Sequence, residues 1–163
     1  MTTTHVEWFV STSRPNVFRA LLDARSVRTW MVPDGMTSRI HEFDPRVGGR
    51  FRISLTYDLP DQTGKTTAHT DTFHGHFVRV VPDTEVAQVV EFETDDPNLQ
   101  GEMAITYSLS DAPGGCRVVA RHENLPPGLS PEDNETGFRM SLAKLAGLAE
   151  KAAAQSEMRH SGD

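Results

Sequence analysis

Apolar and polar residues alternate along much of the first 125 residues, and this period of two predicts β-strands. The clearest alternation is at residues 51–57, where four apolar or aromatic side chains alternate with serine, threonine and arginine. By the same criterion, strands are predicted within residues 5–10, 37–43, 51–57, 73–78, 86–93, 103–109 and 116–124. Turn residues such as Asp83 and Gly114 lie between several of these runs.

Helical periodicity occurs in two places. Apolar residues at helical spacing predict one helix beginning near Pro15 and a short second helix over residues 26–30. A longer helix is predicted over residues 131–154, with a serine cap, a proline and acidic residues at its start. One apolar stripe runs along it, formed by Phe138, Leu142, Leu145, Leu148, Ala149 and Ala152. Residues 58–70 are expected to form a loop, and residues 155–163 a disordered polar tail.

The order of these elements predicts an α+β fold. Because most links between the strands are short, neighbouring strands should be antiparallel. The apolar stripe of the C-terminal helix requires a partner, and only the sheet offers an apolar face of sufficient size. We therefore expect about seven strands curved around that helix. The following residues should be buried together: Phe51, Ile53, Phe77, Ile105, Leu142 and Leu145.

Composition and charge disfavour several kinds of function. A chain of 163 residues fits one domain, predicted here over residues 1–154. Its formal net charge of -7 disfavours binding to nucleic acid or to an anionic membrane. The single cysteine, Cys116, excludes an intrachain disulfide. No signal peptide and no long apolar stretch is visible, so we expect a cytoplasmic protein. We also expect no cofactor.

Several residues give the chain a resemblance to a known superfamily. The most specific segment is the turn Asp44-Pro45-Arg46-Val47-Gly48-Gly49, and the other matching positions are less specific. They are Trp30, Pro33, Gly35, Gly75, Pro82, His122, Leu125, Pro126, Pro127, Gly137, Phe138, Leu142 and Leu145. With the element order, they resemble the START-like (SRPBCC) superfamily. Within it they resemble small bacterial proteins similar to the C-terminal domain of the activator of the ninety-kilodalton heat-shock protein ATPase.

This resemblance covers roughly residues 4–151 and implies a helix-grip fold. The family often carries tryptophan where this chain has Phe138, which keeps an aromatic side chain at that position. Members include ligand carriers and some catalysts, so the resemblance implies no single function.

The glycine turn and the histidines have simple structural interpretations. Asp44 and Arg46 are expected to close the turn, and its glycines to allow a positive φ. His74 and His76 share one face of a strand but lack a third ligand at a suitable spacing, so we expect them to be exposed and to bind no metal. His41 and His69 are expected at the surface.

His122 and Asn124 follow the inward parity of Val118 and Ala120, which suggests a polar end for an apolar pocket. The alternative is a buried histidine that bonds only to protein groups. Methionines at positions 31, 36, 103 and 140 would suit such a lining. The candidate ligand-binding residues are Trp30, Phe51, Ile53, Tyr57, Phe77, Tyr107, His122, Asn124 and Phe138.

Three functions are compatible with these patterns. The first is binding of a small hydrophobic ligand between the sheet and the C-terminal helix. The second is a cyclase or dehydratase that uses His122 as a general base. The third is a protein-interaction module, of cochaperone type, that uses the outer face of the sheet. Whether the chain forms a homodimer, and which ligand it binds, stay open.

Overall fold

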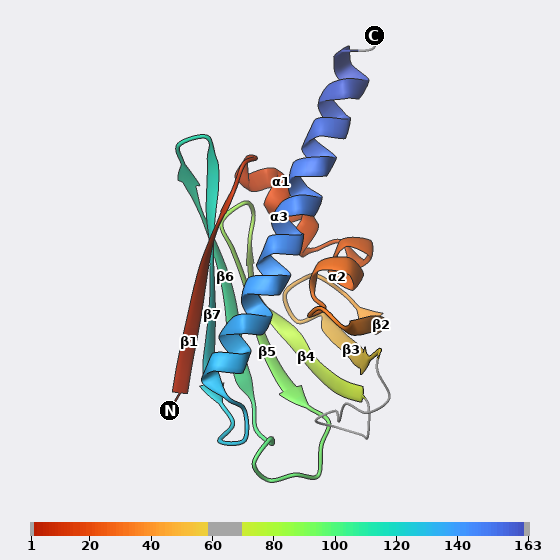
Figure 1. Ribbon diagram of the computed structural model, residues 1–163, viewed down its shortest axis with the longest axis vertical. Coiled ribbons are helices and arrows are strands. Elements are labelled where there is room, and N and C mark those ends of the chain that lie inside the picture. Colours follow the sequence, from red (N-terminus) through yellow and green to blue (C-terminus); the bar gives the residue numbers. More distant parts are fainter. Residues whose placement is uncertain (1, 59–69, 162–163) are drawn as a thin grey trace.

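A computed structural model describes residues 2–58 and 70–161. Most of the predicted loop at residues 58–70, including His69, lies outside the described residues. The described chain forms one antiparallel seven-stranded sheet with the strand order β1-β7-β6-β5-β4-β3-β2. The sheet curves around the long C-terminal helix, as predicted (Figure 1). The strands are β1 (Thr2–Val10), β2 (Met36–Phe43), β3 (Arg50–Tyr57), β4 (Thr70–Val81), β5 (Glu85–Phe92), β6 (Met103–Ala112) and β7 (Gly115–Leu125).

Three helices accompany the sheet within the described residues: α1 (Arg14–Leu21), α2 (Ala24–Trp30) and α3 (Pro131–Ser161). Pro15 lies in the first turn of α1, where its missing N–H has no helical partner to lose. The carboxylate of Asp23 caps α2 by accepting a hydrogen bond from the Ser26 N–H. The helix α3 extends to Ser161, beyond the end predicted at residue 154, so the polar segment up to that residue is helical.

The predicted core is present with one exception. Phe51, Ile53 and Phe77 are buried, as are Leu142 and Leu145 on α3. Ile105 was expected among them but is only partly buried. Its side chain lines a pocket under the start of α3, where no other side chain covers it completely.

The turn between β2 and β3 has the structural role that the sequence indicates. Arg46 Nε lies 2.9 Å from Asp44 Oδ2 and closes the turn. Gly48 has a φ of 84°, and its N–H donates to the Phe77 carbonyl on β4. A Cβ atom on Gly49 would overlap the Asp44 carbonyl oxygen. The turn therefore joins β3 to its neighbour β4 and requires glycine to do so.

The helix α3 does not cover the whole concave face of the sheet. It packs mainly against β1, α1 and α2, and it contacts β7 only lightly. Its C-terminal part extends past the end of the sheet (Figure 1). The first turns of α3 thus stand over β5 and β6 without packing closely on them, and this leaves room for the pocket.

Leu145 should be a main anchor of α3, because its side chain is fully buried. We expect Leu145→Ala to lower the free energy of unfolding by ~2–5 kcal/mol, through lost burial and a new cavity. Urea denaturation measures this loss. Leu148→Ala, on the same helix but only partly buried, should lower stability less. An equal loss in the two variants would contradict the packing described here.

Candidate ligand pocket

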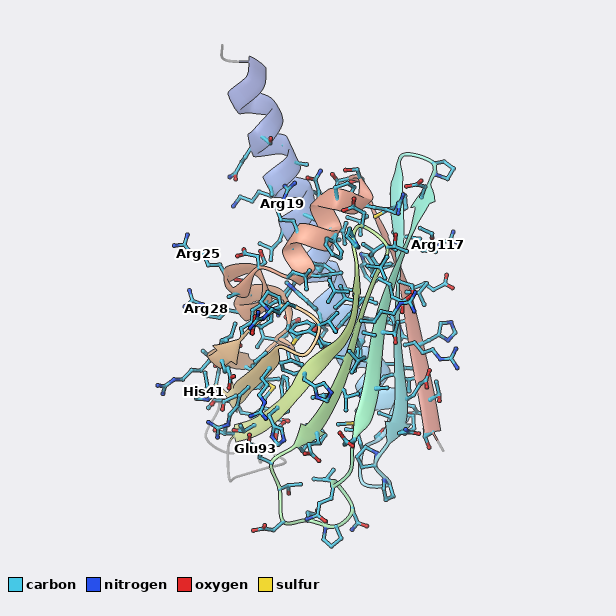
Figure 2. The ribbon with its side chains drawn as sticks, turned by 180° about the vertical axis from the view of Figure 1, so that it is seen from behind. Arg19, Arg25, Arg28, His41, Glu93 and Arg117 are labelled. Atoms are coloured by element: carbon cyan, nitrogen blue, oxygen red, sulfur yellow. The ribbon has the colours of Figure 1, made fainter. Side chains whose placement is uncertain are left out.

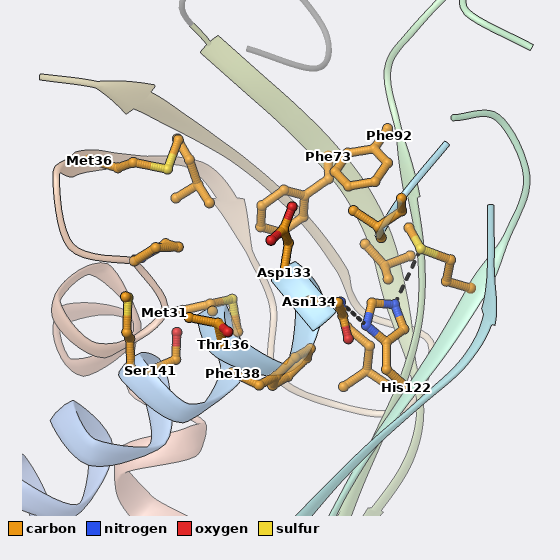
Figure 3. A pocket seen from close by; sticks show the side chains of 18 of the residues that line it. Met31, Met36, Phe73, Phe92, His122, Asp133, Asn134, Thr136, Phe138 and Ser141 are labelled. Carbon is orange, nitrogen blue, oxygen red and sulfur yellow. Dashed lines mark hydrogen bonds between the residues drawn. The ribbon is translucent and has the colours of Figure 1, made fainter. Parts of the chain in front are cut away.

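A pocket of about 580 Å³ lies between the concave face of the sheet and the first turns of α3. Figure 3 shows side chains from the sheet, the α2–β2 region and α3 converging on it. Its wall is largely apolar, and the apolar and aromatic lining residues are Trp30, Met31, Pro33, Met36, Leu55, Tyr57, Phe73, Val90, Phe92, Met103, Ile105, Tyr107, Leu129, Phe138 and Met140. A volume of this size falls within the range of ~300–1,000 Å³ typical of small-molecule sites.

Five of the nine residues that the sequence suggests for ligand binding line this pocket. They are Trp30, Tyr57, Tyr107, His122 and Phe138. The methionines expected in the lining are there as well. Trp30 and Tyr107 meet edge to face with ring centroids 5.8 Å apart, and Tyr107 also contacts Phe138. These rings come from α2, β6 and α3, so three separate elements hold the aromatic wall.

The other four suggested residues do not line the pocket. Phe51, Ile53 and Phe77 have the inward parity that was predicted, but other core side chains cover them. Phe51 and Phe77, for example, pack against each other with centroids 5.5 Å apart. Asn124 was expected beside His122 but is exposed. Its φ of 62° interrupts the alternation of β7 at this residue.

His122 is buried and is held in one orientation by a chain of hydrogen bonds. The Thr4 hydroxyl donates to Asn134 Oδ1 at 2.5 Å, and Asn134 Nδ2 donates to His122 Nδ1 at 2.9 Å. Because Nδ1 accepts, the ring proton belongs on Nε2. Nε2 lies 3.2 Å from Met103 Sδ, a weak acceptor (Figure 3). The imidazole therefore presents an N–H group that has no strong protein acceptor.

Burial also determines the charge of this site. It lowers the pKa of His122 from the usual 6.5 to about 4, so the imidazole is neutral at pH 7. Burial likewise raises the pKa of Tyr107, which keeps its hydroxyl protonated. Among the described residues, no lysine or arginine lines the pocket, whereas Asp34 and Asp133 lie at its exposed edge.

Gln88 is a pocket residue that the sequence analysis does not include among the candidates. It lies on β5, lines the pocket and is only 4% exposed. Within the described chain, neither its side-chain amide nor the hydroxyl of Tyr107 has a hydrogen-bond partner, and both residues border the pocket. The alternation along β5 indicates that Gln88 faces inward, because it has the same parity as Val86 and Val90. Asn134 was also missed, and no local pattern links it to Thr4, which is 130 residues away in the sequence.

Lys144 connects α3 to the segment that borders the pocket. Its ammonium group donates to the Val32 carbonyl at 2.6 Å and lies 3.0 Å from Asp34 Oδ1. The loop after α2 contributes Met31 and Pro33 to the lining, so this contact fixes one wall of the pocket to the helix.

The outer face of the sheet carries many charged side chains (Figure 2). There His74 lies between two carboxylates, with Nε2 2.9 Å from Glu91 and Nδ1 3.0 Å from Glu93. Arg52 binds Glu93 through two hydrogen bonds of 2.8 and 2.9 Å, and this contact lowers the pKa of Glu93 to about 2. His74 and His76 were expected to be exposed but are only partly so. For His74 the carboxylates that lie against it account for the difference.

His41 is exposed, as predicted, and hydrogen-bonds to Ser54 at 2.8 Å. The part of the chain that the structure describes contains no group of three or more His, Cys, Asp or Glu side chains suited to a metal ion. No helix in that part is long and apolar enough to cross a membrane.

The curved sheet and the gripping helix define a helix-grip protein of the START-like class. The sequence matches the family described as Activator of Hsp90 ATPase homolog 1-like protein over residues 11–150, and the chain belongs to this family. Membership of this family supports, in general terms, a role as a ligand-binding or interaction module. No curated protein matches the chain.

Solved structures share the fold over nearly the whole chain. Protein CV1439 from Chromobacterium violaceum is 27% identical, with a TM-score of 0.81 over 91% of this chain and 96% of that one. A Rhodobacter sphaeroides protein is 16% identical, with a TM-score of 0.73 over 90% of this chain and 91% of that one. An AHSA1-like protein from Aeromonas hydrophila is 19% identical, with a TM-score of 0.68 over 93% and 94% of the two chains.

The lowered pKa of His122 has a measurable consequence. An unfolded histidine binds a proton near pH 6.5, whereas buried His122 binds one only near pH 4. Between these values the unfolded chain carries more protons at this site, so the contribution of His122 to stability falls as the pH falls. NMR of the imidazole resonances should show His122 neutral down to about pH 4. A His122 titration above pH 6 would contradict the burial.

Proposed function

We propose that this protein binds an apolar or amphipathic small molecule between the concave face of the sheet and the first turns of α3. One observation carries the proposal: the amide of Gln88 and the hydroxyl of Tyr107 lie in the wall of a largely apolar pocket, and neither has a hydrogen-bond partner among the described residues. Both residues are nearly fully buried, at 4% and 2% exposure. Because both groups border the open pocket, a ligand there can reach them and form the hydrogen bonds that buried polar groups normally have.

A ligand in this pocket would form both apolar contacts and hydrogen bonds with its wall. Its apolar body would be removed from water against the aromatic and methionine side chains, at ~25 cal/mol per Å² of buried apolar area. Its polar atoms would pair with the side chains that have no partner within the protein. Methionine side chains adapt their shape easily, which suits a ligand of irregular outline.

The hydrogen bonds of His122 argue against the enzymatic alternative. A general base needs a free ring nitrogen with a lone pair facing the substrate. In this site Nδ1 already accepts from Asn134, and Nε2 carries the proton. A pKa of about 4 also makes this imidazole a weak base at neutral pH. A binding role requires neither proton transfer nor a second catalytic group.

Gly137 offers a direct test of binding in this pocket. It lies on α3, lines the pocket, and a Cβ atom placed on it would meet no atom within 4 Å. Gly137→Leu should therefore fill the pocket without removing a core side chain. Replacing a helical glycine should also favour the helix by roughly 0.5–1 kcal/mol, so the variant should fold.

The probe for this test is N-phenyl-1-naphthylamine, an uncharged dye whose fluorescence rises in apolar surroundings. We expect saturable binding to the wild-type protein and its loss in Gly137→Leu. Gly147→Leu is the matched control, because Gly147 is exposed on the same helix, has no atom near its Cβ position and does not line the pocket. It should bind as the wild type does. Equal binding by all three proteins, or none by the wild type, would refute the proposal.

A further inference from the structure

Three polar side chains lie together on the concave face of β5, β6 and β7. Gln88 on β5 pairs with Ile105 on β6, and Ile105 pairs in turn with His122 on β7. Gln88, Ile105 and His122 therefore form one row across the sheet. Tyr107 lies two residues beyond Ile105 on the same strand, so its side chain is on the same face and diagonal to both Gln88 and His122. The geometry places an amide, a hydroxyl and an imidazole around one part of the pocket wall.

Each of these groups can donate a hydrogen bond that the protein leaves unused or poorly used. The Gln88 amide and the Tyr107 hydroxyl have no hydrogen-bond partner in the described chain. The Nε2–H of His122 faces only the thioether of Met103, at 3.2 Å. By comparison, the indole N–H of Trp30 in the same wall is satisfied by the Ala20 carbonyl at 3.1 Å. Gln88, Tyr107 and His122 thus bring three available donors together on one part of the sheet wall.

The charges around the pocket act against an anionic ligand. Within residues 2–58 and 70–161, the fully charged side chains that line it are Asp34 and Asp133, both acidic. Lys144 lies close to the edge but is already paired with Asp34 and with the Val32 carbonyl. A carboxylate that entered would lose its hydration without gaining a cation as partner. An uncharged acceptor oxygen loses far less hydration and can use the same three donors.

We infer that this pocket selects uncharged ligands that present a carbonyl oxygen to Gln88, Tyr107 and His122, and that it rejects carboxylates of similar size. The inference rests on the proposed function, since it names the chemical class of ligand for the same pocket. The carbonyl of a ketone or an ester has two lone pairs, so it can accept from two of the donors at once. The planar apolar part of such a ligand would lie against Phe138 and Ile105.

Three naphthalenes of similar size separate the effect of a carbonyl group on affinity from the effects of apolar contact and of negative charge. The compound 2-acetylnaphthalene carries a ketone, 2-ethylnaphthalene has no polar atom, and 2-naphthoate is an anion. Calorimetry at pH 7.5 should show the ketone binding about tenfold tighter than the ethyl compound. The naphthoate should bind at least about 100-fold more weakly than the ketone. Equal affinities for the ketone and the ethyl compound would refute the inference, as would tight binding of the naphthoate. If none of the three binds, the proposed function itself fails.

Two substitutions assign the preference to particular residues. Tyr107→Phe and Gln88→Met keep the side-chain size and remove the donor. Each should reduce the preference for the ketone about threefold or more, and should leave the affinity for 2-ethylnaphthalene unchanged. Tyr57→Phe is the matched control, because Tyr57 also lines the pocket but is less buried and lies outside the row. A loss of preference in Tyr57→Phe alone would place the carbonyl elsewhere and overturn the assignment.

Discussion

The packing of α3 along one side of the sheet is the constraint on which the pocket depends. Leu142, Leu145 and Ala149 bury one stripe of the helix, which packs mainly on β1, α1 and α2. A straight helix of 31 residues is about 46 Å long and cannot follow the curvature of a twisted sheet. Close contact at one edge therefore leaves a gap over β5 and β6. The pocket is a consequence of this geometry, and Lys144 stabilises its wall from the side of α2.

The gap determines which side chains can remain without protein partners. Under the well-packed part of α3, polar groups on the sheet would be covered by apolar atoms. Under its first turns, Gln88, Tyr107 and His122 instead face open space. The chain from Thr4 through Asn134 fixes the imidazole, and so it sets which ring nitrogen carries the proton. Close packing and the open pocket are thus divided between two parts of one helix.

Local patterns were sufficient for the fold and for part of the site. Alternation identified all seven strands, and the apolar stripe identified α3, because both periodicities follow directly from backbone geometry. Inward parity also placed Tyr107 and His122 on the concave face, and the same argument applied to Gln88 would have included it. Parity cannot show which inward residues are covered, so Phe51 and Phe77 were assigned to the pocket although they lie in the core.

The remaining features depend on contacts between distant parts of the chain. The bond between Thr4 and Asn134 joins the first strand to the last helix, and nothing in either segment alone indicates it. The left-handed backbone at Asn124 interrupts a strand that otherwise alternates regularly, so extrapolation of the pattern failed at that residue. The extension of α3 to Ser161 was missed because its last turns contain no apolar stripe to mark them as helical.

The central claim is that the polar groups of this pocket take their partners from a ligand. A crystal structure of the protein with 2-acetylnaphthalene tests it most directly. We expect the ketone oxygen to lie within about 3 Å of the Tyr107 hydroxyl and of either the Gln88 amide nitrogen or His122 Nε2. The naphthalene rings should lie against Phe138. Ordered water on all three groups with the ketone turned to solvent, or a ligand bound outside the pocket, would contradict it.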